Sequence, residues 1–303
     1  MSAEHTTHVL VFGAGGLQGG AVAAKLLEAG NTVKTVVRSE EKAERLRKAG
    51  LEAIAADLAD LDGIRKAYEG VDRVFVTLPV EFNAAKLADY TRNIVEAAKE
   101  AKVKLLVANT SVRVPDDAGG VTALQVKREL IDTIRASGIP SIILEPTLYY
   151  ENFHLPGVLS GNVLAYPVPA DSPIAWIGID EAAAYAVEAL GRPELAGRTI
   201  PIGGPEALTG QELAERFTAA LGRDIQFYSL PVPVFEQAVG SLLGAESGAG
   251  LAGLYAWIGD NASRLAEPGA GSELSSGGLT LSSWIKTQAD NGAFAQANDS
   301  ASE

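Results

Sequence analysis

The stretch that decides the fold reads Val9-Leu-Val-Phe12-Gly13-Ala-Gly15-Gly16-Leu17-Gln18-Gly19-Gly20. Four apolar residues predict a short buried strand, and the glycines follow it at the point where a helix begins. Glycine allows the tight turn there and lets backbone N–H groups approach a pyrophosphate. The N-terminus of the helix then directs unpaired donors and a partial positive charge toward that anion. The stretch therefore predicts a dinucleotide-binding unit, with a glycine-rich turn that holds no ligand as the alternative.

The alternation of strand and helix continues along the chain. Apolar, β-branched runs predict the strands, and helices that end at glycine separate them. Continuous apolar strands of this kind are typical of a parallel sheet that helices cover on both faces. We therefore predict an α/β fold with a Rossmann-type, doubly wound parallel sheet. Its predicted strands are residues 9–12, 32–37, 51–55, 71–78, 104–108 and 141–144, and its predicted helices are residues 20–29, 40–49, 61–68, 83–101 and 123–136.

The second half of the chain is less regular and richer in proline and glycine. Shorter elements are predicted there, and a capping box of Thr209 and Glu212 begins the last of them. The segment 240–278 is dense in Gly, Ala and Ser, and whether it forms a lid stays open. We predict a dinucleotide-binding Rossmann domain over residues 1–150, a smaller substrate-binding α/β lobe, interleaved with the sheet, over residues 151–289, and a disordered polar tail over residues 290–303.

The composition excludes several classes of site. The 303 residues include no cysteine, which rules out disulfides, thiolate metal sites and cysteine nucleophiles. His5 and His8 have no partners that suggest a metal site, so we predict no metal. The net charge of −13 argues against charge-driven binding to nucleic acid or to an anionic membrane.

An uncharged N-terminal segment bears on where the protein acts. Residues 9–24 carry no charge, yet their glycines and Gln18 distinguish them from a signal peptide or a membrane span. We therefore predict a cytoplasmic protein with a small-molecule substrate, and we leave a homodimer open.

A basic residue ends the second predicted strand, which reads Val36-Val37-Arg38-Ser39. Proteins that bind NAD(H) usually place an acidic residue near this point, where it receives the ribose hydroxyls. A guanidinium suits a 2′-phosphate instead, so Arg38 favours NADP(H), with NAD(H) as the second choice and an exposed surface arginine as the alternative. Asp57 and Leu58 follow the third strand, on the adenine side, although Asp57 could equally cap the next helix.

With these residues the chain resembles the NmrA-like branch of the atypical short-chain dehydrogenases, which includes relatives of isoflavone reductase and of NADPH-dependent quinone reductases. The resemblance covers most of the chain, and ordered matches at compatible spacing carry it. Beyond the glycine loop and Arg38 they are Asp57-Leu58, Val74-Phe75-Val76-Thr77-Leu78-Pro79, Asn109-Thr110-Ser111, Lys127, Arg135-Ala-Ser-Gly-Ile-Pro-Ser-Ile-Ile-Leu-Glu-Pro146, Tyr150-Glu151-Asn152, Ile200-Pro-Ile-Gly-Gly-Pro205 and Leu281-Ser-Ser-Trp284.

The resemblance implies a cofactor that lies across the carboxyl ends of the strands. It assigns the pyrophosphate to the glycine loop, the 2′-phosphate to Arg38, and the nicotinamide ribose to Lys127. The remaining implied contacts are Asp57 and Leu58 for the adenine side, Thr77, Leu78 and Pro79 for the central ribose, Asn109 to Ser111 for the nicotinamide side, and Gly13, Gly15, Gly16, Leu17, Gln18 and Gly19 within the loop.

The chain also departs from the family pattern. Ordinary short-chain dehydrogenases place a tyrosine four residues before the lysine, where its phenol protonates the carbonyl oxygen. Here that position is Ala123, and Glu145 stands where many relatives carry arginine. The resemblance allows a missing tyrosine, because some members are cofactor sensors without turnover. Three hypotheses follow: an NADPH-dependent reductase of a small carbonyl, quinone or activated alkene; a non-catalytic NADP(H) sensor that acts through a protein partner; and an epimerase that recycles its cofactor.

Several residues are candidates for chemistry or for substrate contact. A buried Lys127 with a lowered pKa could move protons, although a lysine exposed to solvent is the alternative. Tyr149, Tyr150 and His154 follow the sixth strand, where ligands collect in such sheets; Tyr150 is our candidate for the missing phenol, and packing between the lobes is the alternative. Trp176 and Tyr255 are expected to line the substrate pocket or to fill the second lobe, and Tyr255 lies in the glycine-rich segment, which we expect to be mobile.

Overall fold

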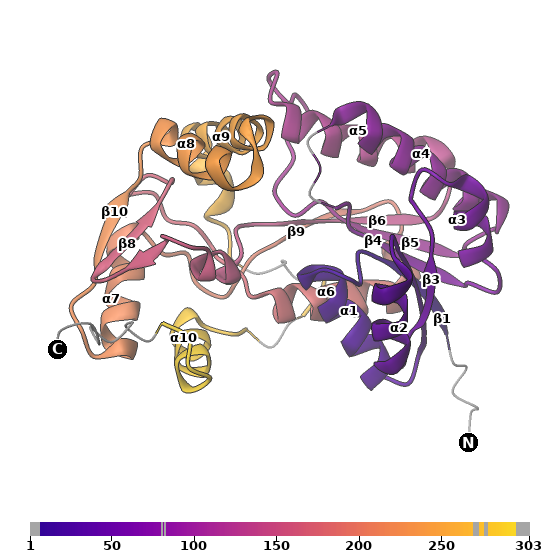
Figure 1. Cartoon of the computed structure of the whole chain (residues 1–303), viewed down its shortest axis with the longest axis horizontal. Helices are drawn as coiled ribbons and strands as arrows, with labels where there is room; N and C mark the ends of the chain where they lie inside the picture. The colour runs from indigo at the N-terminus through magenta and orange to yellow at the C-terminus, as the bar shows by residue number, and fades with distance from the viewer. Residues whose placement is uncertain (1–6, 80, 82, 269–272, 276–277, 295–303) are drawn as a thin grey trace.

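The computed structural model of the chain describes residues 7–79, 81, 83–268, 273–275 and 278–294, and its centre is a seven-stranded parallel sheet (Figure 1). The strand order is β3-β2-β1-β4-β5-β6-β9, which reverses direction beside β1 as a doubly wound sheet does. This order confirms the predicted Rossmann-type fold. The strands are β1 (His8–Phe12), β2 (Thr32–Val37), β3 (Glu52–Ala55), β4 (Arg73–Val76), β5 (Leu105–Asn109), β6 (Ser141–Pro146) and β9 (Thr199–Ile202).

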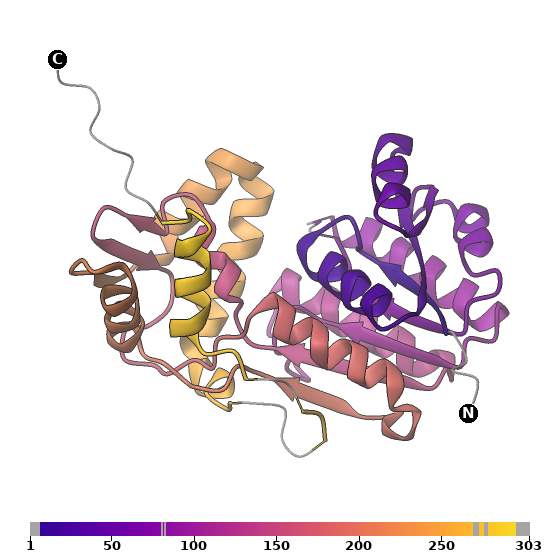
Figure 2. The same cartoon turned by 90° about the horizontal axis from the view of Figure 1, so that it is seen from below.

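Helices cover both faces of this sheet. One face packs against α1 (Leu17–Glu28) and α6 (Ile179–Gly191), which lie in front of the strands in Figure 2. The other face packs against α3 (Leu61–Ala67), α4 (Ala84–Glu100) and α5 (Thr122–Ser137). Successive residues of a strand point to opposite faces, so a strand covered on both sides must be apolar throughout. The apolar run that begins β1 meets this requirement.

Two predicted boundaries differ from the structure in a way that affects the site. Helix α1 begins at Leu17, three residues earlier than predicted, because Gly16 is its N-cap and Gly19 and Gly20 lie inside the helix. Strand β4 ends at Val76 instead of residue 78. Thr77 and the two residues after it therefore leave the sheet at its carboxyl edge.

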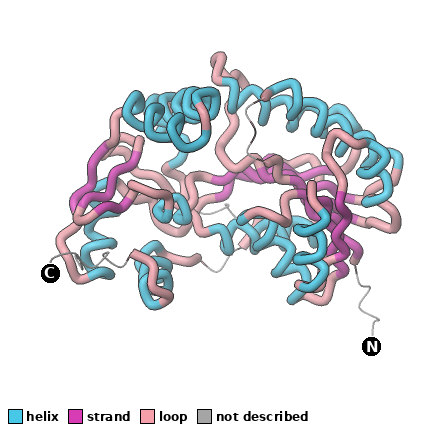
Figure 3. Tube along the Cα trace, viewed as in Figure 1, coloured by secondary structure: helices cyan, strands magenta, loops and turns pink. Residues whose placement is uncertain are grey.

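The chain after residue 150 contributes to two regions. Helix α6 and strand β9 return to the large sheet, where β9 pairs with β6. The remaining elements form a second lobe around the small sheet β10-β8-β7, which Figure 3 shows apart from the large one. The predicted capping box of Thr209 and Glu212 is present at the start of α7. The elements of this lobe are η1 (Tyr150–His154), β7 (Leu159–Ser160), β8 (Val163–Tyr166), α7 (Gly210–Leu221), β10 (Gln226–Ser229), α8 (Val232–Leu243), α9 (Ala245–Asp260), η3 (Ala262–Leu265) and α10 (Leu281–Asp290).

Most of the glycine-rich segment is helical, contrary to the expectation of a mobile stretch. Helices α8 and α9 form a hairpin joined at Gly244, whose φ of +92° favours glycine. A Cβ on Gly248 would lie only 2.7 Å from the carbonyl oxygen of Glu236. The small residues therefore serve close packing of the two helices. Residues 269–272 and 276–277 of this segment, and residues 295–303 of the predicted disordered tail, lie outside the described residues.

Candidate functional site

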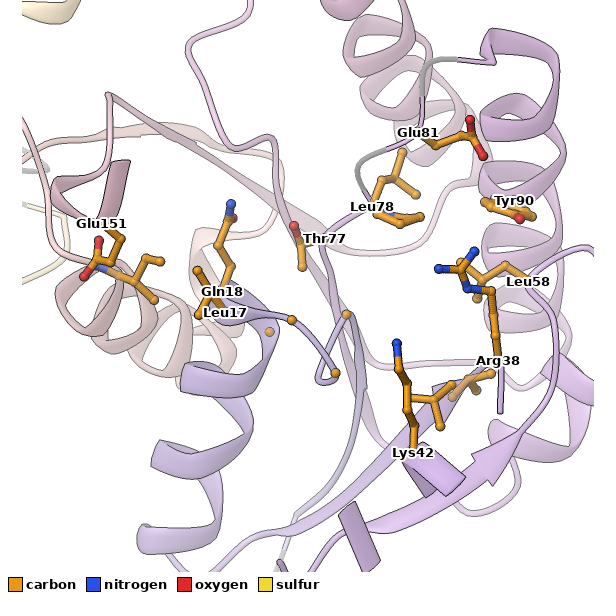
Figure 4. Close-up of a pocket in the computed structure, with 18 of the residues that line it drawn as sticks. Leu17, Gln18, Arg38, Lys42, Leu58, Thr77, Leu78, Glu81, Tyr90 and Glu151 are labelled. Carbon is orange, nitrogen blue, oxygen red and sulfur yellow. The ribbon is translucent and has the colours of Figure 1, made fainter. Parts of the chain in front are cut away.

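Two adjoining cavities open along the carboxyl edge of the large sheet. The first has a volume of about 500 Å³ and lies over the glycine loop and the ends of β2 and β4 (Figure 4). The second, of about 670 Å³, lies between α5, α9 and η1. A ligand in the first cavity can therefore be in contact with one in the second. The residues that line both cavities are Gln18, Leu78, Pro79, Glu81, Tyr149 and Asn152.

The glycine loop needs glycine for steric reasons that the structure makes explicit. Gly13 has a φ of +86°, and a Cβ there would lie 2.6 Å from Cγ2 of Thr77. A Cβ on Gly19 would lie 2.4 Å from the carbonyl carbon and oxygen of Gly13, which are backbone atoms and cannot move aside. The first turn of α1 carries no acidic residue. The start of this helix is therefore close-packed at the wall of the first cavity, with unpaired backbone N–H groups that could receive an anion.

Two cationic side chains lie at another wall of the first cavity. Arg38 comes from the end of β2 and Lys42 from the first turn of α2 (Glu40–Lys48), and Figure 4 shows both pointing into the cavity. Ser39 caps this helix by accepting a hydrogen bond from the backbone N–H of Lys42 at 3.3 Å. The sequence analysis missed Lys42. The signal was present, because a serine cap directly after Arg38 turns the first helical turn back toward the strand end.

Two of the predicted cofactor contacts, the exposed Asp57 and the buried Asn109, line neither cavity. The carboxylate of Asp57 accepts a hydrogen bond from the backbone N–H of Ala59 at 2.8 Å, so it stabilises a turn, while Leu58 lines the first cavity. Asn109 donates through Nδ2 to the hydroxyl of Tyr149 at 3.2 Å. Asn109 therefore positions a lining residue and does not itself line either cavity.

A small polar network lies where the two cavities meet. Oε1 of Gln18 accepts hydrogen bonds from Ser111 Oγ at 3.0 Å and from the Tyr149 hydroxyl at 3.2 Å. Ser111 has a φ of +63°, which is unusual for a residue with a side chain and is typical of functional sites. Burial raises the pKa of Tyr149, so its hydroxyl stays protonated at neutral pH. The network links the loop after β1 to the ends of β5 and β6.

Lys127 reaches the second cavity from α5. Its Nζ donates a short hydrogen bond to the backbone carbonyl of Thr110, which fixes the end of the side chain. Burial lowers the pKa of Lys127 to about 8, although part of the residue still faces the cavity. Lysine with such a pKa can hold or release a proton near neutral pH. Ala123 lines the same cavity one turn earlier, so the position of the missing phenol is open space.

Three predicted residues lie away from both cavities and pack the second lobe. The hydroxyl of Tyr150 donates to the carbonyl of Leu279 at 3.2 Å, and its fully buried ring packs near Trp284. Trp176 is also fully buried, with its ring 4.7 Å from that of Phe153. His154 is exposed and stacks on Phe294. The structure thus corrects the catalytic assignment of Tyr150 and the substrate contacts of Trp176 and His154: each side chain is directed into or along the lobe instead of into a cavity.

Four other residues complete the description of the site. Tyr149 lines both cavities and Tyr255 lines the second, so their substrate contacts stay predictions. Glu151, which the sequence analysis did not select, lines the first cavity and accepts from the backbone N–H of Ile179 at the start of α6, at 3.1 Å. Burial raises the pKa of Glu151.

Glu145 faces the buried Arg113 outside both cavities. Burial raises the pKa of Glu145, and the positive charge of Arg113 partly offsets this effect.

Two kinds of feature are absent from the described part of the chain. No group of three or more His, Asp or Glu side chains there is arranged to hold a metal ion. No helix in that part is long and apolar enough to cross a membrane.

Comparison with known proteins gives a consistent result. The sequence profile of the NmrA-like family matches residues 5–278. An NAD(P)H azoreductase of Xenophilus azovorans is 29% identical over 76% of this chain and 80% of its own. A (4-alkanoyl-5-oxo-2,5-dihydrofuran-3-yl)methyl phosphate reductase of Streptomyces griseus is 31% identical with the same coverage. Among solved structures, the Citrobacter triphenylmethane reductase complexed with NADP(H) matches with a TM-score of 0.75 and 22% identity, over 93% of this chain and 99% of that one. The transcriptional regulator NmrA in complex with NAD matches with a TM-score of 0.76 and 16% identity, over 95% and 98%.

Proposed function

Because the chain belongs to the NmrA-like family, we propose that it binds NADP(H) in the first cavity and reduces a small, mostly apolar acceptor in the second. The observation that carries this proposal is the junction of the two cavities. A dinucleotide cavity with a glycine loop and two cations opens directly into a cavity that holds a half-buried lysine. Reductases among the relatives support the same reaction class.

The residues of the first cavity fit NADP(H). The start of α1 offers backbone N–H groups to the pyrophosphate, and Thr77, Leu78 and Pro79 border the path toward the second cavity. Arg38 and Lys42 together suit the two charges of a 2′-phosphate, with paired hydrogen bonds from the guanidinium and a point charge from the ammonium. This pair supports NADP(H) over NAD(H) more strongly than Arg38 alone.

The second cavity suits an uncharged acceptor such as a carbonyl, a quinone or an activated alkene. Its walls include many apolar side chains, among them Leu87, Val126 and Leu148. The lobe predicted over residues 151–289 supplies the wall formed by α9. NADPH, when bound, supplies a hydride to the acceptor. Lys127 supplies the proton from Nζ to the acceptor atom that gains negative charge, and its hydrogen bond to the carbonyl of Thr110 keeps Nζ at the wall.

The test is NADPH consumption by the purified protein with a panel of quinones and aldehydes. Lys127→Ala should lower the rate with the best acceptor by roughly 100-fold or more, as expected for loss of an acid–base group. Lys99→Ala, on the exposed surface of α4, is the matched control and should retain the wild-type rate. Binding of NADPH without consumption by any acceptor, and without an effect of Lys127→Ala, would contradict the reductase proposal.

That contrary result would support the second candidate, an NADP(H) sensor that acts through a protein partner. The specific observation in its favour is Ala123, which leaves no phenol at the usual position in the second cavity. The solved regulator NmrA, with the same fold, shows that this architecture also serves regulation in another protein. Under this reading the protein binds NADP(H) and does not consume it.

A further inference from the structure

Three polar side chains from separate parts of the chain form a hydrogen-bonded series beside the second cavity. Asn152 on η1 donates through Nδ2 to the hydroxyl of Tyr166 on β8 at 2.9 Å. The hydroxyl of Tyr166 is in turn hydrogen-bonded to that of Tyr255 on α9. Both ends of the series, Asn152 and Tyr255, line the second cavity, whereas Tyr166 is buried behind them with 1% of its surface exposed.

The direction of these hydrogen bonds follows from counting donors. The oxygen of Tyr166 accepts from Asn152, and its own hydrogen needs an acceptor because an unpaired donor at a fully buried position is costly. The Tyr255 oxygen is the neighbour that can accept it. Tyr166 therefore donates to Tyr255. Among the residues that the structure describes, the hydroxyl hydrogen of Tyr255 then has no other acceptor, so it can be donated toward the cavity that this residue lines.

The protonation and the position of Tyr255 support a role as a neutral donor. Burial raises its pKa to about 12, and the hydrogen bond from Tyr166 only partly offsets that effect. The phenol is therefore intact at neutral pH. Its ring is held edge-on between Phe235, with ring centroids 4.8 Å apart, and Tyr166, at 5.5 Å. A donor held on two sides loses little conformational entropy when it binds a ligand.

We propose that the Tyr255 hydroxyl is the hydrogen-bond donor for an oxygen of the substrate, with Tyr166 and Asn152 as the residues that position it. The inference rests on the proposed function and makes the substrate class more specific. Lys127 lines the cavity from α5 and Tyr255 from α9, and apolar side chains line the same cavity. Two donors on different walls fit an apolar ring that carries two acceptor oxygens, as a quinone does. Tyr255 thus provides a phenol from the second lobe where α5 has only Ala123.

The experiment compares two ring compounds of similar shape, 1,4-naphthoquinone and naphthalene, by calorimetric titration into the full-length protein saturated with NADP⁺, so that no reduction occurs. The chain has no cysteine that could trap the quinone. The wild type should bind the quinone more tightly than naphthalene. Tyr255→Phe removes only the hydroxyl and should reduce that preference roughly three- to tenfold, the value of one neutral hydrogen bond. Naphthalene binding should not change.

Controls separate a positioning role from a general packing effect. Tyr228→Phe, on the half-exposed β10 residue outside both cavities, should leave the preference unchanged. Tyr166→Phe and Asn152→Leu should each reduce the preference less than Tyr255→Phe, and Tyr166→Phe combined with Tyr255→Phe should cost no more than Tyr255→Phe alone. A general packing defect would weaken both compounds equally.

The outcomes distinguish this inference from the proposed function. If Tyr255→Phe keeps the wild-type preference, or if the wild type has none, the inference is overturned even where NADPH is consumed. If the wild type binds neither NADP⁺ nor the quinone, the proposed function fails first and the inference fails with it.

Discussion

The two cavities are built in different ways, although they meet at shared residues. The first takes most of its walls from residues 13–90, where most of the lining residues lie at the end of a strand, in the loop after it or in the first turn of the next helix. The second is assembled from segments as distant as Gln18 and Tyr255, and it depends on how the second lobe packs against α5. The ends of the parallel strands and the helices that follow them position most of the first cavity, whereas the second exists only when both regions are folded together. Substitutions should therefore act locally in the first cavity and through the lobe in the second.

The largest effect is expected from a substitution at the tightest contact of the first cavity. Gly19→Ala places a Cβ 2.4 Å from the backbone of Gly13, so the loop must distort. Distortion costing about 3 kcal/mol corresponds to a loss of NADP⁺ affinity of roughly 100-fold. Calorimetric titration measures it, with circular dichroism to show that the variant folds. Gly191→Ala, where a Cβ meets nothing within 4 Å, is the control and should bind as the wild type does. Unchanged affinity in Gly19→Ala would show that the loop does not hold the pyrophosphate.

A smaller effect is expected when either of the two cations at the wall of the first cavity, Arg38 or Lys42, is replaced. Arg38→Ala should weaken NADPH by about 1 to 3 kcal/mol and leave NADH nearly unchanged, because only NADPH carries the 2′-phosphate. Lys42→Ala should weaken NADPH in the same selective way and to a smaller extent, since an ammonium makes no paired contact. Titrations of both nucleotides into each variant provide the measurement. Equal losses for NADPH and NADH would mean that neither side chain reads the phosphate.

The smallest effect is expected in the pH dependence of kcat/KM, which tests Lys127 in the second cavity. Lys127 has a pKa of about 8, so it is mainly protonated below that pH and loses its proton as the pH rises through it. If Nζ supplies the proton, kcat/KM should fall above pH 8, by about tenfold per pH unit. Lys127→Met should be slow at every pH and should lose this slope. A wild-type profile that stays flat from pH 7 to 9.5 would exclude Lys127 as the acid.

The same contrast explains how far the sequence alone could predict the structure. The alternation of strands and helices and the place of the glycine loop between β1 and α1 depend on neighbours close in sequence, and the structure confirms the predicted fold class. Arg38 lines the first cavity, and its contact with a 2′-phosphate stays a prediction. Tyr149 and Tyr150 show the limit. Tyr149 is the extended N-cap of η1 and Tyr150 is the first residue of that 3-10 helix, so the two side chains leave the chain in different directions. Composition does not decide which of them faces the cavity. Tyr149 pairs with Ile177 as an isolated bridge and faces the cavities, while Tyr150 turns into the lobe.

Residues that depend on tertiary packing could not be predicted in this way. The apolar side chain of Trp176 would suit the wall of a pocket, but the rings of neighbouring aromatic residues pack against it in the second lobe. Asn152 and Tyr166 are separated from Tyr255 by most of the second lobe in sequence, and no local pattern brings them together. Lys42 lies between these cases, because only the serine cap before it indicates its direction.

Gln18 lies in the first turn of α1, beside the glycine loop, and also accepts hydrogen bonds from Ser111 and Tyr149 where the two cavities meet. If binding in one cavity shifts Gln18, it changes the affinity of the other cavity, and such coupling is reciprocal. Whatever factor the nucleotide imposes on acceptor binding, the acceptor must impose on nucleotide binding, in whichever order the ternary complex is assembled. The factor by which bound nucleotide tightens acceptor binding is therefore also the factor by which bound acceptor tightens nucleotide binding.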